Sequence, residues 1–269
     1  MTSVFVESKR TDKVDFVKPL RRHILSEHGK ESAEQYEKAL EDLSAVREDL
    51  RLNTERTESA REKFLQYEAD SGTHCILSYT CRYEALLGAA EKHFPIGESG
   101  IRINFYWYDS FTKKRSCKHC LSITVTWLIL QIAQYGMDFE RAGLHFNLGA
   151  IETQIAVLHN RSTDEGVKMA CKYFQMAAGT FSALGEVTQS QPHLAGTPDL
   201  HHEYLSMLSF LMLGQAQECF FQKAQKGGMK PAILFKLAAQ VYDYYDRAGA
   251  LMESTNIKSS VPTVWHTFS

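Results

Sequence analysis

The sequence of 269 residues lacks a dominant charge, a long apolar run and a leader-like N-terminus. Lysine and arginine total 30 against 32 acidic residues, so we expect no basic field that would bind a nucleic acid. The apolar run from Leu121 to Ala133 is shorter than the roughly 20 residues that cross a bilayer. The start, MTSVFVESKRTDKVDF, has no apolar core behind a basic region. These absences predict a cytoplasmic protein that associates with a membrane at most peripherally.

The common catalytic and nucleotide-binding signatures are also missing. The chain contains no GxxxxGK loop, no Rossmann glycine run and no GxSxG. His74-Cys75 ahead of Arg82 is similar to the phosphate loop of cysteine phosphatases. The arginine falls one residue late, however, and no glycine lets the backbone amides converge on an anion. We therefore expect no catalytic residues, no cofactor and no small-molecule substrate.

Six cysteines in a chain of this length do not indicate a disulfide framework. Cys75 with Cys81, and Cys117 with Cys120, form two pairs that each have a neighbouring histidine, and together they offer soft ligands for zinc. The first pair is spaced more widely than usual, and no tight turn shapes either pair. The prediction is that no metal is bound, with a thiol-rich zinc-binding protein as an alternative.

Short strands are predicted near the N-terminus. Residues 4–6 and 101–108 are β-branched or aromatic, and the second stretch follows the turn at 97–100, so we expect the two to pair. Between them, apolar residues from Tyr36 to Leu50 recur at helical spacing among charges. That pattern predicts an amphipathic surface helix with a solvated charged face.

From Phe139 onward, helical periodicity is unbroken over four segments. The segments are 139–159, 162–184, 198–227 and 231–251. The first is apolar nearly all round, as in a helix buried on several sides. The second follows a capping box formed by Ser162 and Glu165. Short loops and small residues predict a mainly α fold, an antiparallel helix stack resembling tetratricopeptide arrays, with a small N-terminal β-sheet.

The stretch LMLGQAQECFFQKA, residues 211–224, combines small, polar and aromatic side chains. Gly214 and Ala216 let a neighbouring helix approach closely, and the glutamines between apolar residues satisfy polar groups in the seam. Phe220 and Phe221 lie about 100° apart on a helix, so they cannot both serve one buried face. One of these rings therefore requires another explanation.

Several segments resemble, in order, the Bro domain family, which includes ALIX, the His-domain tyrosine phosphatase and the rhophilins. They are FYWYDSFT (105–112), FERAGLHFNLGAIETQIA (139–156), STDEGVKMACKYFQMAAGTFSAL (162–184), LMLGQAQECFFQKA (211–224) and MKPAILFKLAAQVYDYY (229–245). The start, FVESKRTDKVDFVKPLRRHI, is also similar, so the resemblance spans roughly residues 4 to 250. It implies a curved, mainly helical domain with a tetratricopeptide-like core.

The resemblance also implies a function. In that family the domain is a non-catalytic endosomal adaptor that binds the amphipathic C-terminal helix of ESCRT-III subunits during multivesicular-body sorting. It implies Phe221 as the aromatic anchor of an apolar groove and Leu234 as a second contact, in a helix-in-groove mode. Aspartate at either position is expected to abolish binding. The alternative is that Phe221 only completes a hydrophobic cluster with Phe220 and Ile233.

Lysines surround this predicted site. Lys223, Lys226 and Lys230 either steer an acidic peptide or form a solvated basic edge. We predict the C-terminal helix of an ESCRT-III subunit as the partner, and recruitment of this cytoplasmic chain to endosomes. A helical-repeat scaffold for another peptide remains an alternative.

The chain departs from the family pattern in three places. Residues 70–85 and 119–133 match nothing in the family and are predicted insertions, and the tail at 252–269 is also unlike it. We therefore predict an incomplete Bro domain over residues 1–251. Family members continue into further helices that supply a third groove contact, so part of the apolar stripe from Leu234 to Leu251 is expected to lack a cover.

Overall fold

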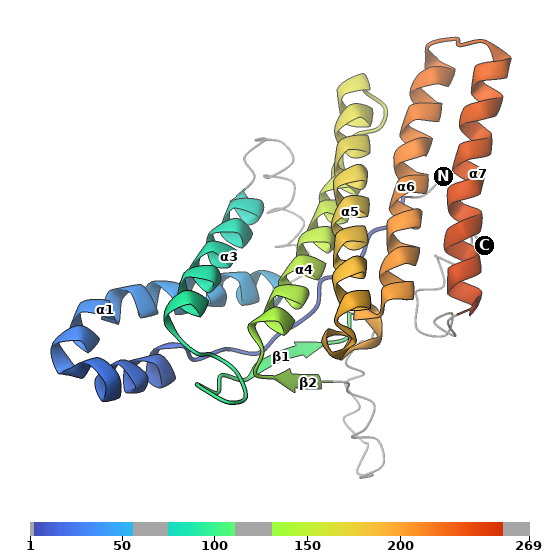
Figure 1. The fold of residues 1–269 in the computed structure, drawn as a ribbon. Helices are drawn as coiled ribbons and strands as arrows, with labels where there is room; N and C mark the ends of the chain where they lie inside the picture. The colour runs from blue at the N-terminus through green and yellow to red at the C-terminus, as the bar shows by residue number, and fades with distance from the viewer. Residues whose placement is uncertain (1–2, 56–74, 111–130, 255–269) are drawn as a thin grey trace, which may run out of the picture.

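The computed structural model describes residues 3–55, 75–110 and 131–254. The elements in these ranges are α1 (Val17–Glu55), α3 (Cys75–His93), β1 (Phe105–Tyr108), β2 (Gln131–Gln134), α4 (Met137–Leu158), α5 (Asp164–Ser190), α6 (His202–Lys226) and α7 (Pro231–Ser254). Figure 1 shows α4 to α7 side by side in a row, with α1 and α3 at one end and the two strands beneath α4. The predicted mainly α fold with an antiparallel helix core and a small sheet is confirmed.

Helix α1 contains the predicted amphipathic helix and bends once. Gly29 has a φ of 81°, outside the helical range and accessible to glycine, so the helix kinks there. Leu40, Leu43 and Val46 are buried at 3–5% exposure, while most of the charged residues between them face solvent. The 3.6-residue period of the apolar side chains thus fixes which face of α1 packs inward.

The small sheet pairs differently from the prediction. β1 lies antiparallel to β2, with Phe105 opposite Gln134 and Tyr108 opposite Gln131. The prediction that residues 4–6 form a strand paired with 101–108 was therefore wrong. The N-terminal segment meets β1 further along, through an isolated bridge between Thr11 and Trp107.

Helix side chains hold the backbone of the N-terminal segment. Gln215 accepts from the Val4 N–H at 2.8 Å and donates to its carbonyl at 3.0 Å. Asn147 does the same for Lys9, at 2.6 and 3.0 Å. Thr153 and Gln154 accept from and donate to the Val6 backbone, at 2.8 and 2.7 Å. In a β-sheet, a neighbouring strand would form the hydrogen bonds of these buried backbone groups. Here, helix side chains form them instead.

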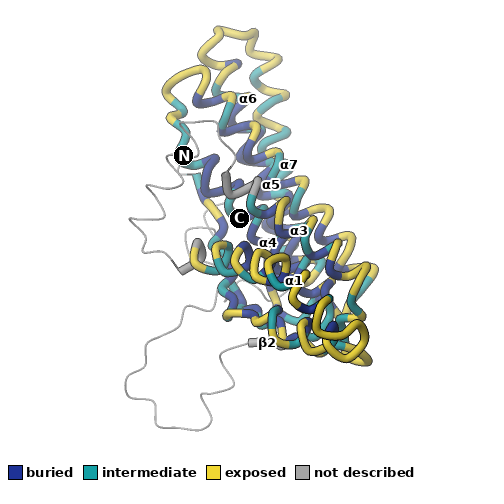
Figure 2. Tube along the Cα trace, turned by 90° about the vertical axis from the view of Figure 1, so that its left-hand side faces the viewer, coloured by how far each residue is buried: buried dark blue, intermediate teal, exposed yellow. Residues whose placement is uncertain are grey.

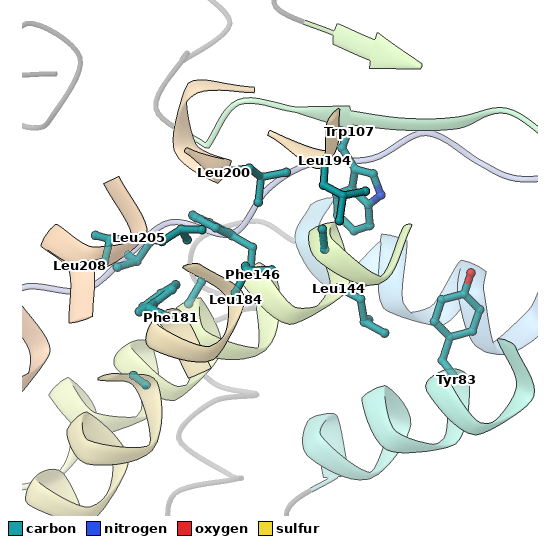
Figure 3. Close-up of a cluster of buried hydrophobic side chains, with 14 of the residues drawn as sticks. Tyr83, Trp107, Leu144, Phe146, Phe181, Leu184, Leu194, Leu200, Leu205 and Leu208 are labelled. Carbon is teal, nitrogen blue, oxygen red and sulfur yellow. The ribbon is translucent and has the colours of Figure 1, made fainter. Parts of the chain in front are cut away.

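Helix α4 forms the centre of the core, as its all-round apolar character predicted. It buries residues on all sides, between α5, α3, β1 and the N-terminal segment. A Cβ on Gly143 would lie 2.3 Å from the Trp107 ring, so only glycine allows this approach. Phe146 from α4, Phe181 and Leu184 from α5, and Leu205 and Leu208 from α6 converge in one cluster (Figure 3).

A buried carboxylate on α4 ties three further elements together. Glu140 accepts hydrogen bonds from Arg47 Nε at 2.5 Å, Tyr83 Oη at 2.8 Å and Trp107 Nε1 at 2.8 Å. Burial, followed by the Glu140 charge, raises the pKa of Tyr83 well above its ordinary value. Tyr83 lies within the first predicted insertion, so part of that segment supplies a fully buried residue. The second predicted insertion lies mostly outside the described residues.

Two helix starts differ slightly from their predictions. The N-cap of α5 is Thr163, whose side chain accepts from the Gly166 N–H at 3.1 Å, and not Ser162. Pro198 begins a short 3-10 turn, and α6 itself starts at His202. Within the described ranges, every helix is too short or too polar to cross a bilayer.

Candidate functional site

Helices α6 and α7 form an antiparallel hairpin at the edge of the row (Figure 1). Gly227 caps α6, and Gly228 has a positive φ of 63° in the turn before α7. A Cβ on Gly214 would lie 2.6 Å from the Tyr245 ring, so this glycine lets the two helices approach closely. Of the two small residues predicted to form a packing seam, Gly214 serves the contact between α6 and α7, whereas the Ala216 carbonyl accepts from the Cys171 thiol of α5 at 3.6 Å.

The two adjacent phenylalanines of α6 have different surroundings. Phe220 is 46% exposed, whereas Phe221 is half-buried. On α7, Ile233 is 43% exposed and Leu234 is half-buried. The sequence predicted Phe221 as the exposed anchor with Leu234 as its companion. The structure gives the greater exposure to the residue immediately before each of them.

Exposed and half-buried side chains form a stripe along one face of the hairpin, which we call the hairpin stripe. Its register follows from the Arg247 guanidinium, which lies 5.6 Å from the centre of the Phe210 ring. Steps of three and four residues from that pair, toward the turn, bring Phe220 opposite Leu237 and close to Ile233. The stripe comprises Phe210, Leu213, Gln217 and Phe220 on α6, and Ile233, Leu237, Gln240, Tyr244 and Arg247 on α7.

The turn end of the hairpin stripe is basic. From Phe220 to Tyr242 the sequence contains four lysines and no acidic residue. Lys223 and Lys230, predicted to steer a partner, are exposed, as is Lys236. Lys226 instead donates to the carbonyls of Arg161 and Ser162 at 3.2 and 3.1 Å. Figure 2 shows that this end of α6 and the turn after it are largely exposed.

A second apolar surface lies on the outer side of α7. Phe235 is 75% exposed and Tyr242 is 70% exposed. Part of the stripe from Leu234 to Leu251 was predicted to lack a cover: of its members, Ala248 is buried, whereas Leu234, Leu237, Val241, Tyr244 and Leu251 are half-buried. The most exposed side chains of α7 are those of its outer face, because α6 packs against the inner one.

The thiols predicted for the zinc alternative lie mostly beyond the described side chains. Cys81 is exposed on α3, whereas Cys117, Cys120 and the side chain of Cys75 lie outside the described part. Among the described residues, no group of three or more histidine, cysteine or acidic side chains is arranged to hold a metal ion. Burial raises the pKa of Cys219 to about 11, so this thiol stays protonated at neutral pH.

Comparison with known proteins gives one consistent family. A model described as BRO1-like domain matches residues 3–269, a range that includes both predicted insertions and the predicted tail, whose boundaries stay predictions. ALG-2 interacting protein X of Dictyostelium discoideum is 38% identical over 261 residues, which cover 97% of this chain and 29% of that protein. Programmed cell death 6-interacting protein of Homo sapiens is 33% identical, with 97% and 27% covered. The chain spans less than a third of these relatives' length.

Solved structures agree. An ALIX BRO1 CHMP4C complex matches with a TM-score of 0.77 and 31% identity, covering 100% of this chain and 68% of that one. ALIX in complex with the SIVmac239 PYKEVTEDL late domain gives the same TM-score and identity, covering 35% of its chain. A structure described as a basis for endosomal targeting by the Bro1 domain, at 20% identity and a TM-score of 0.69, shares the fold. The chain belongs to the BRO1-like domain family.

Proposed function

We propose that this chain is a non-catalytic adaptor of endosomal sorting that binds the amphipathic C-terminal helix of an ESCRT-III subunit. The site is the turn end of the hairpin stripe, with Phe220 and Ile233 as anchors and Phe221 and Leu234 as supporting contacts. The protein turns over no substrate in this role and is recruited from the cytoplasm to endosomes. A solved relative is an ALIX BRO1 complex with CHMP4C, which motivates the choice of partner.

The observation that carries the proposal is the exposure of Phe220 and Ile233 on facing helices. Both side chains are more than 40% exposed, and half-buried Leu237 lies one helical turn after Ile233 on the same stripe. An amphipathic helix presents apolar side chains at positions i, i+3 and i+4. Such a helix, laid across α6 and α7, can contact apolar anchors on both of them. A few buried apolar anchors supply most of the binding energy at such interfaces.

Charge favours an acidic partner. Lys223 and Lys230 are exposed at the turn end of the stripe, and no acidic residue lies between Phe220 and Tyr242 in the sequence. Such peripheral lysines contribute mainly to the association rate and to specificity, because they remain solvated. An amphipathic helix with acidic residues beside its leucines therefore matches both the exposed apolar side chains and the charge of this surface.

Titration of a fluorescent CHMP4C C-terminal helix peptide, followed by anisotropy, tests the proposal. Phe220→Asp and Ile233→Asp are each expected to weaken binding by about 2 kcal/mol or more, about 30-fold, because a charge replaces an apolar anchor. Phe235→Asp is the matched control, since Phe235 is exposed on the outer face of α7. Equal losses in all three variants, or no binding by the wild type, would rule the proposal out.

Two further variants separate the structural and sequence-based anchors. Phe221→Asp and Leu234→Asp alter half-buried side chains, so they are expected to lower the unfolding midpoint as well as the affinity. Thermal unfolding measured beside the titration distinguishes the two effects. If Phe221→Asp removes binding without loss of stability while Phe220→Asp binds normally, Phe221 is the anchor.

A further inference from the structure

A polar cluster of buried and half-buried side chains lies behind the hairpin stripe and joins four segments of the chain. Its members are Ser3, Arg161, Glu218, Gln222 and Tyr245, which we call the hairpin cluster. They come from the N-terminal segment, the connection between α4 and α5, α6 twice, and α7. None of these side chains belongs to the hairpin stripe. The sequence alone predicts no role for them.

Glu218 is the centre of the cluster. It is 5% exposed and accepts a hydrogen bond from Tyr245 Oη at 2.9 Å. Arg161 Nη2 lies 3.6 Å from the other Glu218 oxygen. Burial, followed by the Glu218 charge, raises the pKa of Tyr245 well above its ordinary value, so the phenol stays a donor. A buried carboxylate is tolerated here because α7 and the α4–α5 connection both supply partners.

Arg161 is itself held from several directions. Its Nη1 donates to Ser3 Oγ at 2.6 Å, and its Nε donates to Gln222 Oε1 at 3.2 Å. Its carbonyl accepts from Lys226 Nζ at 3.2 Å. The guanidinium is thus fixed by the N-terminal segment on one side and by the last turns of α6 on the other. It links the position of Glu218 to the body of the domain.

The hairpin cluster contacts the same two helices, α6 and α7, that carry the anchors Phe220 and Ile233. Glu218 precedes Phe220 by two residues, and the Tyr245 ring packs on Gly214 one turn before Glu218. Among the described elements, α7 packs mainly against α6, so these contacts define where α7 lies. A shift of α7 along or away from α6 would change the separation of Phe220 and Ile233.

We infer that Tyr245, Glu218 and Arg161 are positioning residues that set the spacing of the α6 and α7 anchors for the partner helix. This inference rests on the proposed function of the hairpin stripe. A binding surface made from two helices requires its anchors to be held in place, because any reordering on binding subtracts from the affinity. The hairpin cluster supplies that constraint from the side away from the partner.

Tyr245→Phe tests the inference with the smallest chemical change. It removes one buried hydroxyl and keeps the ring on Gly214, so we expect the CHMP4C helix peptide to bind about five- to tenfold more weakly. Tyr242→Phe is the matched control, since Tyr242 is 70% exposed and its hydroxyl lies 3.5 Å from Asp246. Its affinity is expected to equal that of the wild type. Titration well below the unfolding midpoint keeps every variant folded, so a purely structural role leaves the dissociation constant unchanged.

Hydrogen exchange gives a readout that does not depend on the partner. Amides in the last two turns of α6 are expected to exchange faster in Tyr245→Phe than in Tyr242→Phe or the wild type. If the wild type binds and Tyr245→Phe binds equally well, the positioning inference is overturned while the proposed function stands. If the wild type does not bind the peptide, the proposed function fails, and unchanged exchange in Tyr245→Phe overturns the inference as well.

Glu218→Gln provides a second variant if Tyr245→Phe does not fold. It keeps an acceptor for the Tyr245 hydroxyl and removes the charge opposite Arg161. A loss of affinity of about threefold is expected, smaller than for Tyr245→Phe, because the amide leaves no buried charge that lacks a hydrogen-bond donor. Wild-type affinity in Glu218→Gln and in Arg161→Lys would overturn the inference.

Discussion

Helices α4 and α7 are similar in length and apolar content but have opposite surroundings. α4 has 22 residues and buries fifteen of them, among neighbours on several sides. α7 has 24 residues and buries four: Tyr245, Ala248, Gly249 and Met252. The same helical period is present in both segments. The difference lies in how many neighbouring elements cover each helix.

The comparison shows where apolar surface is structural and where it is available for binding. Polar side chains of α4 such as Glu140 and Asn147 have specific partners, so each one fixes a neighbour. At the edge of the row, Phe220, Ile233 and Phe235 remain more than 40% exposed. A helix in the middle of a row contributes stability, whereas the last hairpin described leaves apolar side chains exposed, and the proposed function uses Phe220 and Ile233 among them as anchors.

Removal of a buried ion pair from the core should lower the stability of the domain more than any of the changes described below. Lys9 and Asp199 are fully buried, with their charged groups 2.6 Å apart. Asp199→Ala leaves the buried Lys9 ammonium hydrogen-bonded to the Thr197 hydroxyl but without its carboxylate partner, and is expected to lower the free energy of unfolding by about 3–5 kcal/mol. Urea denaturation measures this change. Glu165→Ala, which removes an exposed pair with Lys168, is the control and should have no measurable effect.

A loss for Asp199→Ala no larger than that of the control would contradict this view of the core. It would mean that water or a local rearrangement satisfies Lys9 once its partner is gone.

Helical periodicity predicted the helices well because packing in this fold follows it. The four segments from residue 139 onward correspond to α4, α5, α6 and α7. The predicted strand at residues 4–6 was wrong because Val4 and Val6 have the composition of a strand, whereas their hydrogen-bond partners are helix side chains. Gln215, the partner of Val4, is 211 residues away in sequence, so no local pattern indicates it.

The sequence does not decide which of the two adjacent phenylalanines of α6 is the more exposed, for a physical reason. Phe220 and Phe221 are both apolar and lie about 100° apart, so periodicity alone does not tell which ring meets solvent. The orientation of α6 depends on the close contact between Gly214 and Tyr245, which only the folded structure reveals. The sequence does contain one indication of this orientation. Glu218 and Gln222 are four residues apart and so lie on one polar face of α6, which indicates that this face contacts a polar partner inside the domain.

A buried carboxyl group between α4 and α5 should make the core sensitive to pH. Burial raises the pKa of Glu152 from 4.5 to about 7, although a hydrogen bond from Thr180 lowers it. The folded state therefore holds a proton that the unfolded state releases, so stability is full below about pH 4.5 and falls as pH rises toward about 7. Glu152→Gln is expected to be about 1–3 kcal/mol more stable than the wild type at about pH 8, and equal at about pH 4. Urea denaturation at both pH values measures this difference, and a pH-independent difference would contradict it.

The first predicted insertion offers a test with a smaller expected effect. Tyr83-Glu84-Ala85 repeats the triplet Tyr67-Glu68-Ala69, so deletion of residues 70–85 joins an identical triplet to Leu86. Tyr67 is then expected to take the place of Tyr83 beside Glu140, and the free energy of unfolding should change by about 1 kcal/mol or less. Thermal unfolding measures this change. Tyr83→Phe in the full chain shows what loss of the hydroxyl alone does. An unfolded deletion variant would show that the segment is integral to the core.

The smallest effect is expected where the hairpin stripe meets solvent. Lys223 and Lys230 are exposed, so their charges act on a partner through water and salt weakens them. Reversing both, with Lys223→Glu and Lys230→Glu, should slow association of an acidic helix peptide about two- to fivefold at low salt, with little change in dissociation. Stopped-flow anisotropy at two salt concentrations measures both rates. Lys30→Glu together with Lys38→Glu on α1 makes the same net-charge change far from the stripe and should leave both rates unaltered. An equal slowing in both proteins would show that net charge, and not the placement of these lysines beside Phe220, steers the partner.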